Sequence, residues 1–234
     1  TTSTTTTATI LNALDGKTSV AVDADAITAI TGDIAQGATM AGSSGLTLKS
    51  DYTFGATNAA TTAGLVANVA TIAADTAGTV TATITGSGSL TAAQINSNLS
   101  TGSSGDALTV NLAAATVAAT DITGIDSKTG TAVNTDAVTL ITGTISETLA
   151  VETAHAANTV DTGDADTAYT ISGTQTATGT VGNITTIAAD TSGTVTASIG
   201  SLTAAQINTN LTSASDDAIT IETTSTTTTA TILN

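Results

Sequence analysis

The chain has 234 residues, a formal net charge of −16 from 19 acidic residues and three cations, and no cysteine, proline or tryptophan. Three cations cannot displace the condensed counterions of a polynucleotide, so we expect no nucleic-acid partner, and the same charge disfavours anionic membrane surfaces. The lack of cysteine excludes disulfides and thiolate metal sites.

The composition predicts an ordered chain with a thin core. Hydrophobic residues make up 40%, charged residues only 9%, and the mean hydropathy is +0.30, which argues against a disordered acidic chain. Aromatic residues make up 1%, so the interior must consist of small and β-branched side chains. No segment is apolar for long enough to cross a membrane. We expect an extracellular location, on or outside a bacterial cell.

The first twelve residues, TTSTTTTATILN, recur without change as residues 223–234, at an offset of 223 − 1 = 222. This duplication predicts that residues 1–222 form one full period of a longer array and that residues 223–234 begin the next period. Within the duplicated segment, Ile10, Leu11 and Leu14 have helical spacing and predict a short helix from Ala8 to Leu14. We expect Thr223–Asn234 to pack on the preceding coil as an added rung.

Four apolar runs that each end in glycine divide the period further. They end at Gly32, Gly86, Gly143 and Gly200, and the differences between successive positions are 54, 57 and 57. We therefore expect four subunits of about 55 residues, grouped in two halves of about 1–111 and 112–222. Each subunit contains a second strand-like run, which gives eight strand positions per period and about 28 residues per coil. These second runs are Leu46–Lys49, Ala107–Leu112, Tyr169–Ser172 and Ala218–Ile221.

Other segments alternate between strand and helix patterns. Thr79–Ile84 reads TVTATI, which is typical of a strand. The stripe Leu65, Val66, Val69 and Ile72 favours a helix. Two nearly identical segments, LTAAQINSNL and LTAAQINTNL, have apolar residues at helical spacing. Both also have the spacing of a capping box, in which a threonine and a glutamine three residues later cap the first turn of a helix. The two pairs are Thr91 with Gln94 and Thr203 with Gln206.

These patterns predict an α/β to mainly β fold: a repeat solenoid of stacked parallel β-strands with short helices, about 28 residues per coil. Parallel neighbours need a crossover of a dozen residues or more, and the helical segments supply it. The alternative is a string of tandem antiparallel β-sandwich domains of about 111 residues each.

Few residues suggest chemistry, and we expect no enzyme. Gly16-Lys17-Thr18 resembles the end of a phosphate-binding loop, but Leu11 stands where that motif needs glycine, so a helix C-terminal turn is the better interpretation. His155 is the only histidine, and we interpret it as a surface or loop residue.

Asp161, Asp164 and Asp166 lie close together in DTGDADT and form a candidate Ca²⁺ site, since hard oxygen donors in a turn suit this ion. The alternative is a solvated acidic loop, because neither the EF-hand spacing nor the calcium nonapeptide is present. We therefore expect either no cofactor or Ca²⁺ at this loop.

The segments IDSKTGTAVNTDAVTLITGT, IAADTAGTVTATITG and LTAAQINTNL resemble the repeats of giant cysteine-free bacterial surface proteins. This group includes very large cell-surface proteins of marine cyanobacteria and type I-secreted repeat adhesins. The resemblance implies an extracellular structural or adhesive role and transfers no catalytic residue.

The expected function is that of a structural segment in an extracellular filament, sheath or cell-surface stalk. Its expected partners are further copies of the same repeat, end to end and side by side. The alternative is a calcium-stiffened adhesin repeat that presents a distant binding tip.

Overall fold

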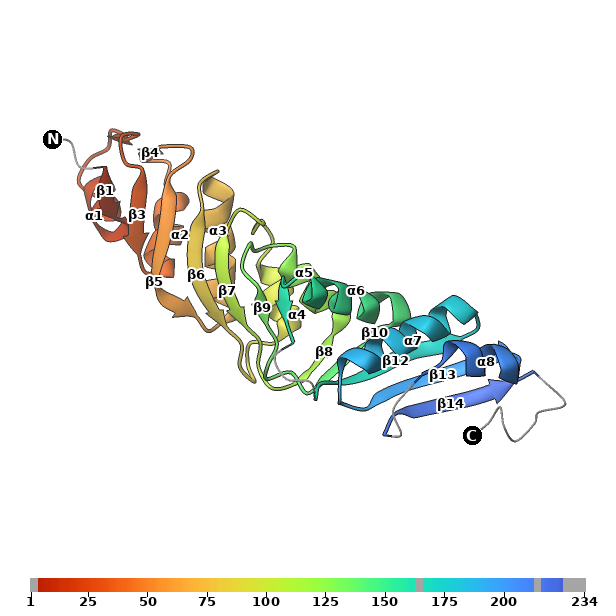
Figure 1. The fold of residues 1–234 in the computed structure, drawn as a ribbon. Coiled ribbons are helices and arrows are strands. Elements are labelled where there is room, and N and C mark those ends of the chain that lie inside the picture. Colours follow the sequence, from red (N-terminus) through yellow and green to blue (C-terminus); the bar gives the residue numbers. More distant parts are fainter. Residues whose placement is uncertain (1–3, 163–165, 213–215, 225–234) are drawn as a thin grey trace. The chain divides into compact units, whose positions relative to one another are not determined.

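The computed structural model describes residues 4–162, 166–212 and 216–224. The chain divides into two compact units: residues 1–113 with 124–134, and residues 114–123 with 135–234. Both units combine parallel strands with helices (Figure 1), so the predicted α/β class is confirmed.

The first unit contains a parallel sheet whose strands follow the order of the chain, β1-β3-β5-β6-β7-β9. A short parallel pair of β2 and β4 lies apart from it. The bounds are β1 Thr5–Thr7, β2 Val22–Ala24, β3 Ala29–Gly32, β4 Leu46–Leu48, β5 Thr53–Ala60, β6 Val80–Thr85, β7 Ala107–Asn111 and β9 Val133–Asn134.

The second unit repeats this plan with a parallel sheet in the order β8-β10-β12-β13-β14. Its strands are β8 Thr116–Ala118, β10 Leu140–Thr144, β12 Ala168–Gln175, β13 Val195–Leu202 and β14 Ala218–Thr223, and the short strand β11 spans Val160–Asp161.

A helix connects each strand of these sheets to the next, and within each unit neighbouring helices pack on one another over one face of the sheet (Figure 1). The described residues form eight helices: α1 Ala8–Asp15, α2 Ile34–Ala41, α3 Ala63–Asp75, α4 Ala92–Asn98, α5 Ala119–Asp126, α6 Ile145–Ala156, α7 Thr178–Asp190 and α8 Ala204–Asn210.

Local sequence explains where these helices start. Both predicted capping boxes are confirmed: in α4 the Gln94 amide hydrogen-bonds Thr91 Oγ1 at 3.3 Å and the Thr91 amide hydrogen-bonds Gln94 Oε1 at 2.9 Å, and α8 has the same arrangement. The predicted helix from Ala8 is also confirmed, with Thr7 as its cap.

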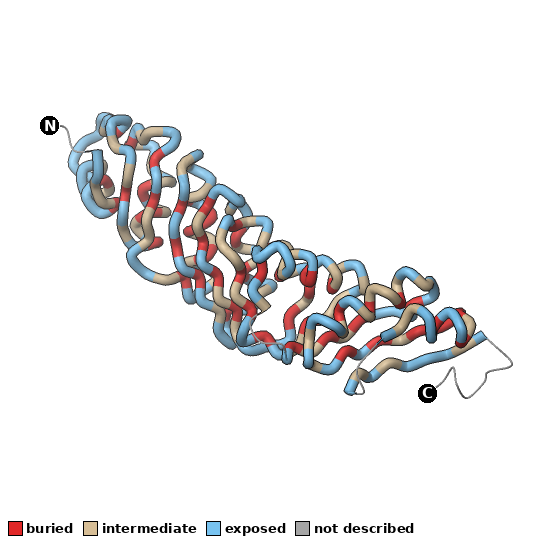
Figure 2. Tube along the Cα trace, viewed as in Figure 1, coloured by how far each residue is buried: buried red, intermediate tan, exposed pale blue. Residues whose placement is uncertain are grey.

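Alternation along the strands separates a buried face from an exposed one. In β6, Val80, Ala82 and Ile84 are buried, whereas the threonines between them are exposed. Buried and exposed stretches alternate in the same way along other strands (Figure 2). Threonine keeps the β-branched shape that favours a strand and offers a hydroxyl to water. The uncovered face of this parallel sheet can therefore remain solvated, although such sheets are usually covered on both faces.

The strand predictions need two corrections. Leu46–Lys49 forms a strand, but it pairs with β2 outside the main sheet. The strand that occupies that place in the main sheet is β5, which pairs with β3 and β6. Its sequence TFGATNAA is rich in small and polar residues, so it shows no clear apolar alternation. The segment 225–234, expected as an added rung, lies outside the described residues.

Register offsets between paired strands lie at or below the predicted coil length. The offset is 28 for β10 with β12, where Leu140 pairs with Ala168, and 24 for β1 with β3. It is smallest at the end of β13, where Leu202 pairs with Thr223 at an offset of 223 − 202 = 21. Every pairing from β1 to β9 in the first sheet, every pairing in the second sheet and the pairing of β2 with β4 is parallel, which contradicts the alternative of antiparallel sandwich domains.

We predict that Gly78→Ala destabilises the first unit by about 1–3 kcal/mol, since forcing an atom into a packed site costs this much. A Cβ at Gly78 would lie 2.3 Å from the Tyr52 carbonyl oxygen and 2.6 Å from that of Asp51. Urea unfolding followed by circular dichroism measures the effect. The control is Gly64→Ala in α3. An added Cβ at Gly64 would have no neighbouring atom within 4 Å, and alanine should stabilise the helix by up to about 1 kcal/mol. Equal midpoints for the two variants would contradict the prediction.

Candidate functional site

The second unit contains a cluster of ionisable side chains that come from three elements. Glu152 lies in α6, Tyr169 in β12 and Asp190 at the last residue of α7, and α6 packs on both other elements. Glu152 is only 6% exposed and Tyr169 2%. Carboxylates are rarely buried to this degree without a partner, so this cluster is the strongest candidate for a functional site.

The surroundings of Glu152 favour its neutral form. Burial, together with the nearby Asp190 carboxylate, raises the pKa of Glu152 to about 8, and the Tyr169 hydroxyl opposes part of this shift. One carboxyl oxygen, Oε2, is buried and has no hydrogen-bond partner among the described residues. Burial and the two acidic neighbours in turn raise the pKa of Tyr169.

His155 lies one turn beyond Glu152 in α6 and borders the same cluster. Its Nε2 lies 3.9 Å from Asp190 Oδ2, and its side chain is 36% exposed. Its other ring nitrogen, Nδ1, lies 3.0 Å from Thr162 Oγ1 and 3.3 Å from the Val160 carbonyl oxygen. The residue is partly exposed, as expected, but it belongs to a helix rather than to a loop.

The first unit has the same framework at a constant offset in the sequence. The pairing of Phe54 with Val80 corresponds to that of Tyr169 with Val195. Thr76 Oγ1 donates to the Tyr52 carbonyl oxygen as Thr191 Oγ1 donates to that of Thr167. The differences 169 − 54, 195 − 80, 191 − 76 and 167 − 52 all equal 115, so Glu152 corresponds to Gly37 and Asp190 to Asp75.

Helix ends agree with this alignment. The C-caps Gly42 of α2 and Ala157 of α6 differ by 115, whereas the N-caps Asp33 and Thr144 differ by 111. Helix α6 is therefore α2 lengthened at its start by about one turn of helix.

The chemistry at the corresponding positions of the first unit is different. Phe54 occupies the space above Gly37, where an added Cβ would lie 2.5 Å from the phenyl ring. The Tyr52 hydroxyl donates a hydrogen bond of 2.9 Å to Asp75 Oδ2. The second unit has Thr167 in place of Tyr52, so its aspartate lacks this phenolic donor.

The predicted calcium loop is described only in part. Asp161 and Asp166 are exposed, and Asp164 lies outside the described residues. The Asp161 carbonyl oxygen accepts hydrogen bonds from the amide and hydroxyl of Thr135, at 2.8 and 2.9 Å. Within the described ranges, no group of three or more acidic or histidine side chains could hold a metal ion. The calcium site therefore stays a prediction.

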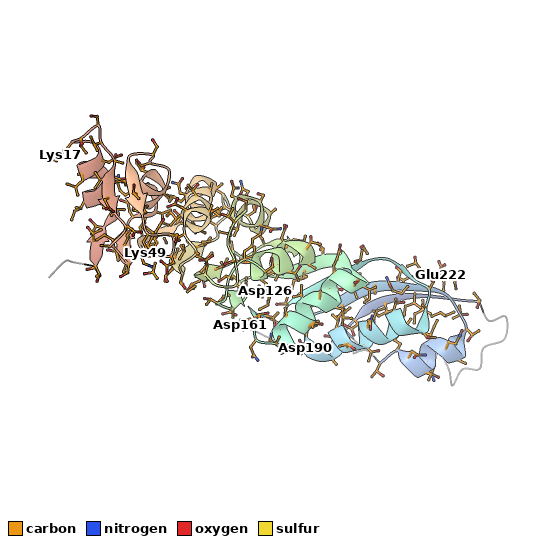
Figure 3. All side chains as sticks on the ribbon, turned by 90° about the horizontal axis from the view of Figure 1, so that it is seen from above. Lys17, Lys49, Asp126, Asp161, Asp190 and Glu222 are labelled. Atoms are coloured by element: carbon orange, nitrogen blue, oxygen red, sulfur yellow. The ribbon has the colours of Figure 1, made fainter. Side chains whose placement is uncertain are left out.

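The three lysines lie in a helix C-terminal turn or pair with neighbouring polar side chains. Gly16 caps the C-terminus of α1 and its amide donates to the Asn12 carbonyl oxygen at 3.1 Å, which confirms the interpretation of Gly16-Lys17-Thr18 as a helix C-terminal turn. Lys49 pairs with Asp51. Lys128 donates to Asn96 Oδ1 at 2.6 Å. Figure 3 shows Lys17 and Lys49 with the other side chains of the first unit.

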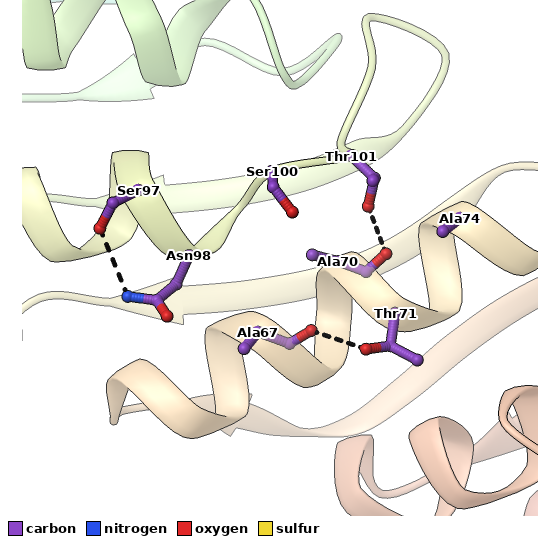
Figure 4. Close-up of a pocket in the computed structure, with 8 residues that line it drawn as sticks. All are labelled: Ala67, Ala70, Thr71, Ala74, Ser97, Asn98, Ser100 and Thr101. Atoms are coloured by element: carbon purple, nitrogen blue, oxygen red, sulfur yellow. Dashed lines mark hydrogen bonds between the residues drawn. The ribbon is translucent and has the colours of Figure 1, made fainter.

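A groove of about 440 Å³ lies between α3 and the end of α4 (Figure 4). Both of its threonine hydroxyls are already engaged: Thr71 Oγ1 donates to the Ala67 carbonyl oxygen at 3.1 Å and Thr101 Oγ1 to that of Ala70. None of its side chains is an acid or a base. The lining residues are Ala67, Ala70, Thr71, Ala74, Ser97, Asn98, Ser100 and Thr101.

At the matching place of the second unit, Thr185 replaces Ala70 and connects α7 to the end of α8. Its hydroxyl donates to the Asn210 carbonyl oxygen at 3.0 Å and accepts from the Thr212 amide at 2.8 Å. The groove between α3 and α4 thus lies where Ala70 lacks the hydroxyl by which Thr185 connects α7 to α8.

Comparisons with known proteins found no matching family model, curated protein or solved structure. Among the described residues, no helix has both the length and the apolar character needed to span a membrane.

We predict that Tyr52→Phe destabilises the first unit by about 1–3 kcal/mol, because Asp75 then loses a buried donor at the negative end of α3. Urea unfolding of Tyr52→Phe, Asp75→Asn and the double variant measures the coupling between the two side chains. Additive effects of the two substitutions would show that the hydrogen bond contributes nothing.

Proposed function

We propose that this chain is a structural segment of an extracellular tandem-repeat filament, sheath or cell-surface stalk, in which the parallel strands continue from one period to the next as a solenoid. The observation that carries the proposal is a match between two periods. Thr7 caps α1, and its copy in the duplicated segment is Thr229, at the offset 229 − 7 = 222. The described residues between them form eight helices, so one sequence period corresponds to eight strand–helix steps.

A whole number of steps per period is what an uninterrupted array requires. The mean step is 222/8, or about 28, which is the value expected for one coil. If the period ended within a step, each new copy would begin with its strand out of place. With eight complete steps, each copy can add its first strand to the last strand of the copy before it.

Side chains reinforce the contact between consecutive steps. Asn12 Nδ2 donates to Gln36 Oε1 at 3.0 Å, and the Ile34 amide donates to Asn58 Oδ1 at 2.8 Å, each across 24 residues. Thr28 and Thr53 hydroxyls likewise donate to carbonyl oxygens one step earlier. These bonds use residues within the repeat itself, so further copies extend the structure without any new kind of contact.

The sheet edge in the second unit supports end-to-end growth. Among the described strands β14 pairs with β13 alone, and its Ile221 is 41% exposed. An open parallel edge with exposed apolar residues readily accepts another strand. We infer that the next copy of the repeat covers this edge, and the resemblance to bacterial surface-protein repeats supports an extracellular setting.

We predict that chains of one, two and three periods lengthen by roughly 38 Å per period, because eight strands stack at about 4.8 Å each. Small-angle X-ray scattering of the three purified chains measures this increment. A matched control places a flexible Gly/Ser linker between the periods, which separates the stacks and should give a larger, variable increment. An increment of roughly 80 Å without the linker, the length of two compact domains placed end to end, would contradict the solenoid.

We also predict that removal of calcium leaves the melting temperature of a three-period chain unchanged, since the proposed stability comes from strand pairing and side-chain bonds between steps. Melting curves in excess chelator and in excess Ca²⁺ test this. A rise of the melting temperature in Ca²⁺ would favour the alternative of a calcium-stiffened adhesin repeat, and loss of that rise in Asp161→Asn or Asp166→Asn would locate the site.

A further inference from the structure

We propose that Glu152 keeps its proton at neutral pH beside the Asp190 carboxylate, so that the contact between α6 and α7 is a built-in pH-responsive element of the second unit. This inference is independent of the proposed filament function. It rests on the burial of Glu152, on the arrangement of donors around Asp190 and on a comparison with the corresponding site of the first unit.

Asp190 is 44% exposed and occupies a position that favours a hydrogen-bond donor. It is the last residue of α7, where the unpaired carbonyl groups of the helix make a second negative charge unfavourable. Asp75 has the same position at the end of α3, and there the Tyr52 hydroxyl donates to it at 2.9 Å. In the second unit Thr167 replaces this tyrosine, and Glu152 replaces Gly37 beneath the aromatic ring. A protonated Glu152 therefore supplies the donor that the substitution removed.

Ionised Glu152 would be poorly solvated at this place. Only 6% of the residue is exposed, and its Oε2 receives no hydrogen bond from any described residue. An ionised carboxylate needs several donors, and a charge on the buried Glu152 next to the Asp190 carboxylate, whose side chain is 44% exposed, is unfavourable. A proton held on Glu152 removes both problems.

Few other charged groups face Glu152 from the elements around it. Helix α6 itself contributes Glu147 and His155, α7 contributes Asp190, β12 contributes Tyr169 and β11 contributes Asp161; β10 has no ionisable side chain. His155 is the only one that can become a cation, and its Nε2 lies 3.9 Å from Asp190 Oδ2. A variant at His155 therefore separates its contribution from that of the carboxyl pair.

The sign of the effect follows from the direction of the pKa change. The folded chain holds the Glu152 proton up to about pH 8, whereas the ordinary pKa of a glutamate is 4.5. Folding thus binds a proton between these values, and the second unit loses stability as the pH rises from about 4.5 to about 8. Above that range Glu152 is ionised in both states and the dependence ends.

The test uses the unusual scarcity of glutamate. The chain has only three glutamates, Glu147, Glu152 and Glu222, so labelling with ¹³C at the glutamate carboxyl gives three resonances that can be followed from pH 3 to pH 10. Glu147→Gln and Glu152→Gln assign two of them. Glu147→Gln is the matched control, because it changes a half-buried capping residue of the same helix and keeps a side chain that can cap.

We expect one resonance to titrate near pH 8 and to vanish in Glu152→Gln, while the other two titrate in the ordinary range. It should persist in His155→Gln. In Asp190→Asn its midpoint should fall by roughly one pH unit or more, because the like charge is gone. Circular dichroism of each variant confirms that it is folded.

Two outcomes would overturn the proposal. If all three resonances titrate near the ordinary value, Glu152 holds no proton at neutral pH. If one titrates near pH 8 but does not move in Asp190→Asn, burial alone holds the proton on Glu152 and the contact with α7 plays no part. A second readout is hydrogen exchange of the α6 and α7 amides relative to those of α2 and α3 at each pH. Their relative protection should fall towards pH 8 in the wild-type chain and stay constant in Glu152→Gln.

Discussion

Within each unit, parallel pairing between neighbouring strands of the main sheet governs the architecture. Strand β3 pairs with β1, β12 with β10 and β14 with β13, in each case after an intervening helix, and these backbone hydrogen bonds set the register of each sheet. With only 1% aromatic residues, the core cannot be held by large side chains. Regular hydrogen bonding and a narrow layer of Val, Ile, Leu and Ala replace them.

Strand pairing and alternation together explain how a sequence with few charged and aromatic residues can still specify one arrangement. Alternation in β6 directs Val80, Ala82 and Ile84 towards the helices and the threonines outwards, and a slip of one residue would reverse the two faces. Hydrogen bonds between residues 24 apart, such as that from the Ile34 amide to Asn58 Oδ1, also favour the observed register. The threonine-rich face then stays solvated and needs no second layer of helices.

The two units show how much chemistry this framework tolerates. At equivalent places one has Gly37, Tyr52 and Phe54 around Asp75, and the other has Glu152, Thr167 and Tyr169 around Asp190. Both arrangements fill the same space and place groups around an aspartate at a helix end. The first does so with a phenol and the second with a carboxyl group, so the second responds to pH in the neutral range. Helix α6 is also about one turn longer at its start than α2.

Local sequence was sufficient to specify the capped helices that begin after Thr91 and Thr203, the helix after Thr7, the strand β6 and the duplicated segment. These features depend on contacts within a few residues, which spacing reveals directly. Three other outcomes emerged only from the folded chain: Leu46–Leu48 pairs with β2, the weakly patterned β5 enters the main sheet, and Glu152 of α6 meets Asp190 of α7. They depend on which surfaces pack together after the chain has turned, and no local spacing encodes them.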